Sequence, residues 1–354
     1  MKSAKENILK HTHNTNIDLL KLCACIGVIG LHTFKYNAAP ILYYLCCFSV
    51  PVFFMVSGYF SLNKAIPTGG GYYIKKITSV LRIVILWNII RFLISLSGIL
   101  IRKDISEYSI TYLTKQILES FLQKGKMWHF WYLGALILIY LFLFIFNGLY
   151  KTITLFYKNK VYFMFLLWGT AILCSIIIQA VSMFQGKSVQ QHIIQTFRLW
   201  CWIQYFILGG LVPHIQPVLM KKLSDKQHLL LLCISSIFIV WYQYTISNHI
   251  LNTKFAEYFY DSIFIIGWVF ILFTFILRLH ISGKWYKYIS VSCPLTLGVY
   301  IVHPLVMSSI VGKLNSIPNY TAAICSFIIV LITSFTGVWV LNKIWFIKKY
   351  LLTL

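Results

Sequence analysis

Three ionisable residues in the first long apolar segment, Asp18, Lys21 and His32, supply an acid, a base and an imidazole. An α-helix turns about 100° per residue, so the eleven steps from Lys21 to His32 make three turns and about 20°. Asp18 lies three positions before Lys21, on the same side. Ionisable groups at bilayer depth cost roughly 2.5 to 3.5 kcal/mol each on insertion scales and usually face a bundle interior or a watery cavity. The stripe is therefore a candidate functional site.

Two interpretations of this stripe remain open. If the helix starts near Asn16, a rise of about 1.5 Å per residue places His32 some 20 to 25 Å across the bilayer, nearer its outer face. Asp18 and Lys21 then lie near the inner face. In the plainer interpretation, Asp18 and Lys21 form an interfacial ion pair and His32 is a hydrogen-bonded packing residue. That interpretation does not explain a histidine at this depth, so we favour a functional stripe.

Two further histidines are expected at the outer depth of the bilayer. His129 opens the fourth apolar segment, in MWHFWYL, and His303 lies in the outer half of the ninth, in LGVYIVHPLV. A neutral imidazole can act as a general base near neutral pH or ligate a metal. Three histidines without a carboxylate or cysteine at ligand spacing are weak evidence for a metal, and we predict none. For His129 alone, an interfacial position beside Trp128 and Trp131 is an equally good explanation.

Basic and small polar residues are expected at the inner face. Lys75, Lys76 and Arg82 stand at the inner mouth of the third apolar segment. Cations there either bind the phosphates of an anionic cofactor or simply flank a span on its positive side. Ser57 and Gly58 lie at the inner end of the second segment, in PVFFMVSGYF. Ser57 can donate a hydrogen bond and Gly58 permits close helix approach, although such a pair in a membrane helix usually serves packing.

Two arginines lie in the outer halves of their segments. Arg91 and Arg198, with Gln195 and Gln204, are candidates for burial in the bundle. A buried cation suits an anionic sugar or a tetrahedral oxyanion. Asp261, at the outer start of the eighth segment, is a candidate ion-pair partner for either arginine. Snorkelling of the arginines to the interface explains them equally well.

The elements that position these residues are predicted to be membrane helices. Of the 354 residues, 59% are hydrophobic and 11% charged, and the mean hydropathy of +0.77 is far too high for an ordinary soluble domain. Near-continuous apolar runs such as 41–59 and 163–178 argue against the alternating strands of a membrane β-barrel. We predict an all-α polytopic membrane helix bundle of about ten helices, beginning near Ile17, Ile41, Ser79, Trp128, Val161, Phe197, Leu229, Ser262, Val291 and Thr321.

The chain shows no internal repeat and no soluble domain, which predicts a single membrane-embedded domain over residues 1–354. Its longest hydrophilic piece is an outer loop, residues 101–127. Within this loop, residues 108–121 have apolar side chains at helical intervals, so an amphipathic surface helix is expected there. Such a helix either covers a site from outside or merely connects two spans.

The formal net charge of +23 follows membrane topology. Segments on the side of the N-terminus hold nineteen Lys and Arg residues, against nine on the other side. The positive-inside rule then places both termini in the cytoplasm and predicts a multi-pass protein of the cell membrane, surrounded by lipids and without a nucleic-acid partner. No cleavage site follows the first apolar run, so that run is expected to stay in the protein. The nine cysteines lack paired spacing and are typical of small apolar packing residues.

Five motifs together resemble the acyltransferase 3 family, integral membrane enzymes that acylate sugars and other acceptors. NIDLLKLCACIGVIGLH is similar to the family's opening pattern of Ile-Asp, a basic residue, ten intervening residues and His. FFMVSGYF, WHFWYLGALILIYL, YFILGG and LGVYIVHP resemble its motifs in the second, fourth, sixth and ninth spans. The motifs keep their order and spacing from Asn16 to Pro304, nearly the whole chain.

The sequence departs from the family pattern at two places. Lys21 stands where the family typically has arginine, so a bidentate fork becomes a single point charge. The Arg-x-x-Arg pattern of the family's third span here reads Lys76, Ile77, Thr78, Ser79. Arg82, about one turn deeper, is a possible substitute.

The resemblance implies a donor, an acceptor and a site. The donor is a cytoplasmic acyl-CoA, by default acetyl-CoA, with no permanently bound cofactor, and the acceptor is a hydroxyl of an exported or lipid-linked glycan. His32 is expected to be the general base or acyl carrier, with Asp18 and Lys21 orienting the site or binding the donor. We expect acceptor choice to depend on the outer loop and on Arg91, Arg198 and Asp261. The remaining expected contributors are Ser57, His129, Trp131 and His303 for substrate, and Lys75, Lys76 and Arg82 for the donor.

Two other functions are consistent with intramembrane charges in a helix bundle. Intramembrane charges also mark transport pathways, so a glycan or lipid-precursor transporter or flippase is the alternative. A transporter predicts paired half-repeats and broken helices, which the sequence does not show. A membrane-embedded sensor is the third possibility, and it is expected to carry an appended soluble domain. Turnover of acetyl-CoA in the presence of a glycan acceptor discriminates the enzyme from both.

Overall fold

The computed structural model describes residues 14–64, 70–153, 159–310 and 319–353 except 101–109, and the side chains of 96–100 and 153 are also left out. All regular secondary structure in these ranges is helical. The main helices are α2 (Thr15–Thr33), α3 (Pro40–Leu45), α4 (Ser49–Leu62), α5 (Gly71–Leu100), α6 (Ile110–Phe121), α7 (Trp131–Ile153), α8 (Lys160–Gln185), α9 (Leu199–Lys222), α10 (Asp225–His249), α11 (Ile263–Arg278), α12 (Gly283–Ser292), α13 (Thr296–Ile310), α14 (Tyr320–Leu341) and α15 (Trp345–Leu351).

Nine helical segments in the described ranges are long and apolar enough to cross a membrane. Three of them combine consecutive helices: Pro40–Leu62 contains α3 and α4, Gly283–Ile310 contains α12 and α13, and Trp128–Thr152 contains the short helix Trp128–Phe130 and nearly all of α7. The eighth predicted span corresponds to α11, whose 16 residues make it shorter than the others. The prediction of an all-α polytopic bundle is therefore confirmed. Against the predicted number of about ten helices, the described residues contain nine segments long enough to cross a membrane and the shorter helix α11.

Local sequence explains where several helices begin and end. The Asn14 side chain accepts hydrogen bonds from the backbone N–H groups of Asn16 and Ile17, at 3.1 and 3.3 Å, and so caps the first turn of α2. Ser224 and Gln227 form a reciprocal capping box at the start of α10. α8 ends at Gly186, whose φ of +65° is the left-handed conformation that glycine adopts without strain.

Helices α4 and α9 pack backbone against backbone. A Cβ atom added at Gly58 would lie 1.7 Å from the carbonyl oxygen of Phe206, and one added at Gly209 would lie 1.9 Å from the carbonyl oxygen of Met55. Only hydrogen atoms fit at these two crossings. Gly58 therefore permits the close helix approach that small residues give membrane helices.

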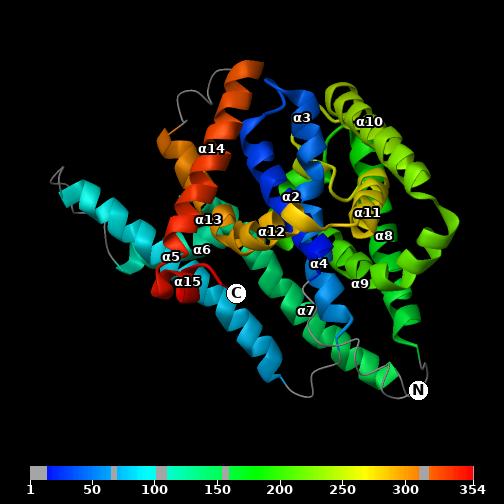
Figure 1. Ribbon diagram of the computed structural model, residues 1–354, viewed down its shortest axis with the longest axis horizontal. Helices are drawn as coiled ribbons and strands as arrows, with labels where there is room; N and C mark the ends of the chain where they lie inside the picture. Colours follow the sequence, from blue (N-terminus) through cyan, green and yellow to red (C-terminus); the bar gives the residue numbers. More distant parts are fainter. Residues whose placement is uncertain (1–13, 65–69, 101–109, 154–158, 311–318, 354) are drawn as a thin grey trace.

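Helix α2 lies inside the bundle and is contacted by α4, α11, α12, α13 and α14. Figure 1 shows α2 and α4 in the middle, with α5, α6 and α15 on one side and α10 and α11 on the other. The start of α2 is tied to the end of α11, because Asn16 Nδ2 donates to the carbonyl oxygens of Ile276 and Leu279 at 2.7 and 2.8 Å. Below, the "Asp18 end" denotes the end of the bundle where α2 begins, and the "His32 end" the one where it finishes.

Helix α6 occupies most of the segment in which an amphipathic helix is expected. It packs against α5, α7 and the short helix Trp128–Phe130, and it buries the polar side chains of Gln116 and Ser120. The Ser120 hydroxyl lies 3.4 Å from Asn88 Nδ2 of α5. Residues 101–109 of the predicted loop lie outside the described residues, and the membrane depth of α6 stays a prediction.

Candidate active site

A cavity of about 480 Å³ lies at the His32 end of the bundle. His32 of α2 and His129 line it, together with the loop after α2 and the segments around Gln123, Gln195 and Glu257. Its volume is within the range of small-molecule sites, roughly 300 to 1,000 Å³. Much of its surface is aromatic, from Phe53, Trp128, Trp131, Tyr132, Tyr260 and Tyr300.

The three histidines expected at the outer depth come together here. The rings of His32 and His303 stack with centroids 5.4 Å apart and planes 21° apart. His129 lies 6.0 Å from His303 between ring centroids, and Trp128 packs edge-on against His32 at 5.0 Å. Residues more than 270 positions apart in the chain thus form one cluster, because α2 and α13 pack side by side.

A hydrogen bond defines the tautomer of one histidine in the cluster, His303. His303 Nδ1 lies 3.1 Å from the Val299 carbonyl oxygen, which can only accept, so Nδ1 carries the proton. His303 Nε2 and both ring nitrogens of His129 are buried and have no hydrogen-bond partner among the described residues. His32 is half-buried and makes no hydrogen bond to a described residue. The cluster therefore presents unpartnered imidazole nitrogens beside a cavity.

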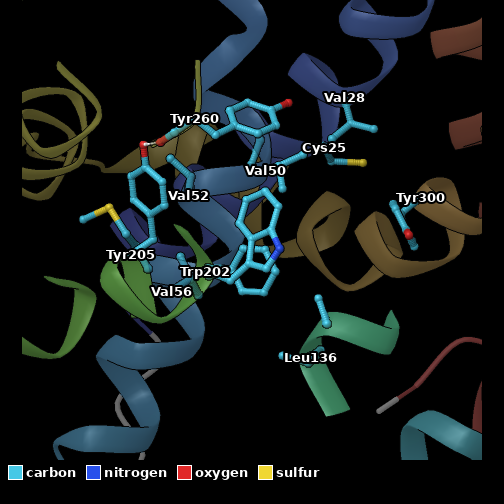
Figure 2. Close-up of a cluster of buried hydrophobic side chains, with 14 of the residues drawn as sticks. Cys25, Val28, Val50, Val52, Val56, Leu136, Trp202, Tyr205, Tyr260 and Tyr300 are labelled. Atoms are coloured by element: carbon cyan, nitrogen blue, oxygen red, sulfur yellow. Dashed lines mark hydrogen bonds between the residues drawn. The ribbon is translucent and has the colours of Figure 1, made fainter. Parts of the chain in front are cut away.

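Buried aromatic side chains pack next to the cavity and hold its lining residues in place. Trp202 of α9 stacks on Phe54 of α4, with ring centroids 4.8 Å apart. The Tyr205 hydroxyl donates to the Tyr260 carbonyl oxygen at 2.6 Å, as Figure 2 shows. The Tyr300 hydroxyl donates to the His129 carbonyl oxygen and so links α13 to the segment that carries His129. These contacts hold the lining residues on rigid elements.

One wall of the cavity is polar. Glu257 Oε2 accepts hydrogen bonds from Gln195 Nε2 and, at 3.5 Å, from Gln123 Nε2. Behind this wall lies Arg198, 4% exposed, whose NH2 is 3.7 Å from Glu257 Oε1. The Arg198 guanidinium also donates to the carbonyl oxygens of Ile193, Glu257 and Gln190. Arg198 is therefore buried, as one of the two predictions had it, but it stabilises the wall and does not line the cavity.

The expected pairing of Asp261 with an arginine is wrong. The Asp261 carboxylate is buried and accepts hydrogen bonds from Gln190 and Trp200, at 2.8 and 3.0 Å, and from Gln179. Burial raises the pKa of Asp261, and these three donors oppose the rise. Glu257 takes the place beside Arg198 because it lies on the turn that the guanidinium already bonds through its backbone.

A second polar group lies at the Asp18 end. Lys21 Nζ is 3.2 Å from Asp18 Oδ1, and the side chains are 30% and 10% exposed. The Cys293 thiol, between α12 and α13, lies 3.1 Å from the same carboxylate oxygen and donates to it. Lys21 also lies over the ring of Phe60, 5.4 Å from its centroid. The ion pair of the plainer interpretation exists, and Cys293, expected to be a packing residue, hydrogen-bonds to it.

The cations expected at the inner mouth of the third span have different environments. Lys75 is exposed, and Lys76 is half-buried and close enough to Lys64 and Lys75 for their charges to repel. Arg82 donates to the Thr353 carbonyl oxygen at 2.8 Å and lies over the Tyr350 ring. The two lysines therefore present positive charge at the Asp18 end, whereas Arg82 holds the C-terminal segment.

Besides Arg198 and His303, two further expected substrate-binding residues, Ser57 and Arg91, are not among the residues that line the cavity. The Ser57 hydroxyl donates to the Phe53 carbonyl oxygen one turn earlier, at 2.9 Å. The Ser57 side chain also lies beside Tyr132, a residue that lines the cavity. Arg91 Nε is buried without a hydrogen-bond partner among the described residues. Lys126 lies close enough for the two positive charges to repel. Burial, followed by the Arg91 charge, lowers the pKa of the Lys126 ammonium.

Sequence reasoning missed Glu257 and Gln123, which no motif marks. In the part of the chain that the structure describes, no group of three His, Cys, Asp or Glu side chains has the geometry to hold a metal ion. An imidazole cluster beside a cavity in a bundle of membrane helices suits either an intramembrane transferase or a transporter. The comparisons with known proteins decide between the two.

Residues 14–343 match the acyltransferase domain that defines the acyltransferase 3 family. The chain therefore belongs to this family, and it is a multi-pass membrane acyltransferase. No curated protein and no solved structure matches the chain. The match extends over nearly all of the chain, including the segments that carry both polar groups, and it favours the enzyme over the transporter.

Proposed function

We propose that this acyltransferase moves an acyl group, acetyl by default, from a cytoplasmic acyl-CoA to a hydroxyl of an exported or lipid-linked glycan in the cell membrane. The observation that carries the proposal is the position of His32. It is the residue of the α2 stripe that lines the cavity, and none of its ring nitrogens is hydrogen-bonded to a described residue. A general base needs such a free lone pair beside the space where its substrate binds.

In the proposed reaction, a ring nitrogen of His32 takes the proton of the acceptor hydroxyl. The oxygen attacks the thioester carbonyl, and a tetrahedral intermediate forms. When this collapses, the C–S bond breaks and the imidazolium returns the proton to the leaving thiolate, which yields the ester and CoA. In the variant with a covalent intermediate, the unprotonated ring nitrogen of His32 attacks the thioester carbonyl, the C–S bond breaks and CoA leaves as its thiolate, which gives an acyl-imidazolium. The acceptor hydroxyl then attacks the acyl carbon, the C–N bond to His32 breaks, and the hydroxyl proton goes to the CoA thiolate, so that the ester, CoA and neutral His32 are formed.

His303 supports this step by position. Its Nδ1–H is held by the Val299 carbonyl, and its ring stacks on His32. Since Nδ1 carries the proton, Nε2 of neutral His303 is an acceptor in the cluster. His303 thereby fixes the plane of the His32 ring in an otherwise apolar, aromatic environment.

We assign the donor to the Asp18 end. Lys21, Lys75 and Lys76 lie there, and ammonium groups are suitable partners for the phosphates of CoA. The aromatic cavity at the other end is assigned to the acceptor. With the topology predicted from the basic loops, the donor enters from the cytoplasm and the acceptor from outside.

The test uses His32→Ala, with His249→Ala as the matched control, because His249 is an exposed histidine at the end of α10 and lies outside the cavity. Membranes with each variant are incubated with radiolabelled acetyl-CoA, and label in the glycan fraction is counted. We expect transfer to fall at least about 100-fold in His32→Ala, the lower range for a positioned general base. Retained transfer in His32→Ala refutes the role of His32. Glycan export without any dependence on CoA supports a transporter.

The acceptor itself is identified in cells. Surface glycan is prepared from cells with the gene, without it, and with the His32→Ala variant, and the O-acyl groups are located by NMR. The expected result is one modified hydroxyl that is present only with the active gene.

A further inference from the structure

We propose that the polar wall formed by Glu257, Gln195 and Gln123 is the binding subsite for a neutral, hydroxyl-bearing sugar ring, an inference that rests on the proposed transfer to a glycan. All three side chains line the cavity that His32 lines. They come from three separate connections at the His32 end, near α6, before α9 and before α11. None of them belongs to the motifs that resemble the family.

The first observation is a buried acceptor without a donor. Gln195 is 4% exposed, its Nε2 is used by Glu257, and its Oε1 is buried with no hydrogen-bond partner among the described residues. Buried polar atoms are almost always hydrogen-bonded. Because Gln195 is a lining residue of the cavity, a donor that arrives with a ligand is the candidate partner for this oxygen.

The second observation is that the polar wall presents hydrogen-bond acceptors, whereas the Arg198 guanidinium donates to protein carbonyl oxygens. The Glu257 carboxylate is held in place by Gln195 and Arg198, and its side chain is 23% exposed. Arg198 donates to the carbonyl oxygens of Ile193, Glu257 and Gln190, at 2.9, 3.2 and 2.8 Å, and so faces the protein. Carboxylate and amide oxygens accept from O–H groups, whereas a carboxylate on the ligand would meet them acceptor to acceptor.

The third observation is the aromatic surface of the same cavity. Trp128, Trp131 and Tyr132 contribute rings to its lining, and the Trp128 ring contacts His32. A pyranose has apolar C–H faces and an equatorial belt of hydroxyls. Aromatic rings suit the faces and the polar wall suits the belt. Lys35, the other charged lining residue that the structure describes, lies on the loop after α2 and can also bind a hydroxyl.

The experiment measures binding without chemistry. Wild-type protein in nanodiscs is titrated with methyl glycosides of glucose, galactose, mannose and N-acetylglucosamine, and with the methyl glycosides of the matching uronic acids. Binding is followed by saturation-transfer difference NMR. We expect at least one neutral glycoside to bind saturably and about tenfold more tightly than its uronate.

Two variants test the wall. Glu257→Gln removes the charge but keeps the shape, and Gln195→Leu removes the unpartnered oxygen. Each is expected to weaken binding of the neutral glycoside about tenfold, the loss that corresponds to one hydrogen bond of about 1.4 kcal/mol. Glu119→Gln is the control, because Glu119 of α6 pairs with Lys115 and does not line the cavity. Gel filtration and thermal unfolding verify that each variant is folded.

The subsite is refuted if no neutral glycoside saturates, if uronates bind as tightly, or if both folded wall variants bind like the wild type. His32→Ala separates this inference from the proposed function. It should still bind the neutral glycoside saturably, because the polar wall is intact, while acyl transfer falls at least about 100-fold. If the wild-type protein binds the sugar but never uses acyl-CoA, the result supports the sugar subsite and refutes the proposed acyl-CoA donor.

Discussion

Substitution of Gly58 by alanine tests the closest helix contact in the bundle. The new Cβ would lie 1.7 Å from the Phe206 carbonyl oxygen, and Cβ atoms essentially never come within 3.0 Å of another heavy atom. Helices α4 and α9 must then separate by about 1.3 Å, the difference between these two distances, because a backbone oxygen cannot rotate away as a side chain can. Overpacking of this kind costs about 1 to 3 kcal/mol, and the better helix propensity of alanine returns about 0.5 to 1 kcal/mol.

The control is the same substitution where space is available. Gly169 lies in α8, and nothing lies within 4 Å of a Cβ built there. Gly169→Ala should therefore leave stability unchanged or raise it by up to about 1 kcal/mol. The pair of variants separates the effect of the helix crossing from that of helix propensity.

A thiol-reactive fluorogenic dye provides the assay, because Cys25, Cys47, Cys201 and Cys293 are buried free thiols that become accessible on unfolding. Gly58→Ala should unfold at a lower temperature than the wild type, and Gly169→Ala should not. Acyl transfer should fall in Gly58→Ala as well, because α4 contributes Val50 and Phe53 to the cavity lining. Equal unfolding temperatures for Gly58→Ala and wild type would refute the packing argument.

Three further predictions concern charged groups. Lys21→Met should raise the KM for acyl-CoA about tenfold or more and leave acceptor binding unchanged, with Lys21→Arg retaining function; steady-state kinetics with varied donor decide this. Arg198→Met removes the ion pair with Glu257 and three hydrogen bonds to carbonyl oxygens, and breaking a buried pair costs about 3 to 5 kcal/mol, so thermal unfolding should show a large loss. Asp261→Asn replaces one carboxylate oxygen by an NH2 group, so that a donor faces the donors of Gln190 and Trp200. It should lower the unfolding temperature without changing acyl transfer per folded molecule.

The sequence was sufficient for the helices and for the histidine cluster. Apolar runs of span length predict helices because the backbone N–H and C=O groups can hydrogen-bond only to each other inside a membrane. Successive spans cross in opposite directions, so the sequence also predicts which helix ends lie on the same side. His32, His129 and His303 each lie near the same end of their spans, so their common depth could be predicted, whereas their contact requires that α2 and α13 pack side by side.

The polar wall was beyond the reach of the sequence because it depends on short connections. Glu257 lies on a single turn, Ala256–Tyr258, with no periodic pattern to mark its burial. Charge alone made Asp261 as good a partner for Arg198 as Glu257, and only the path of the backbone favours Glu257. Cys293 reads as apolar in a hydrophobic segment, and its bond to Asp18 joins residues 275 positions apart.

In the proposed function, the geometry of α2 assigns the three residues of the stripe, Asp18, Lys21 and His32, to two different tasks. The helix runs unbroken from Thr15 to Thr33, so at about 1.5 Å per residue His32 lies roughly 21 Å along the axis from Asp18 and roughly 16 Å from Lys21. No hydrogen bond reaches across such distances, and therefore Asp18 and Lys21 cannot touch the atoms that react at His32. Acyl-CoA is itself an extended molecule, with its phosphates at one end and its thioester at the other. Bound along α2, one donor would meet the cations at the Asp18 end and bring its carbonyl to His32, so the charge pair would govern donor binding while His32 governs the chemistry.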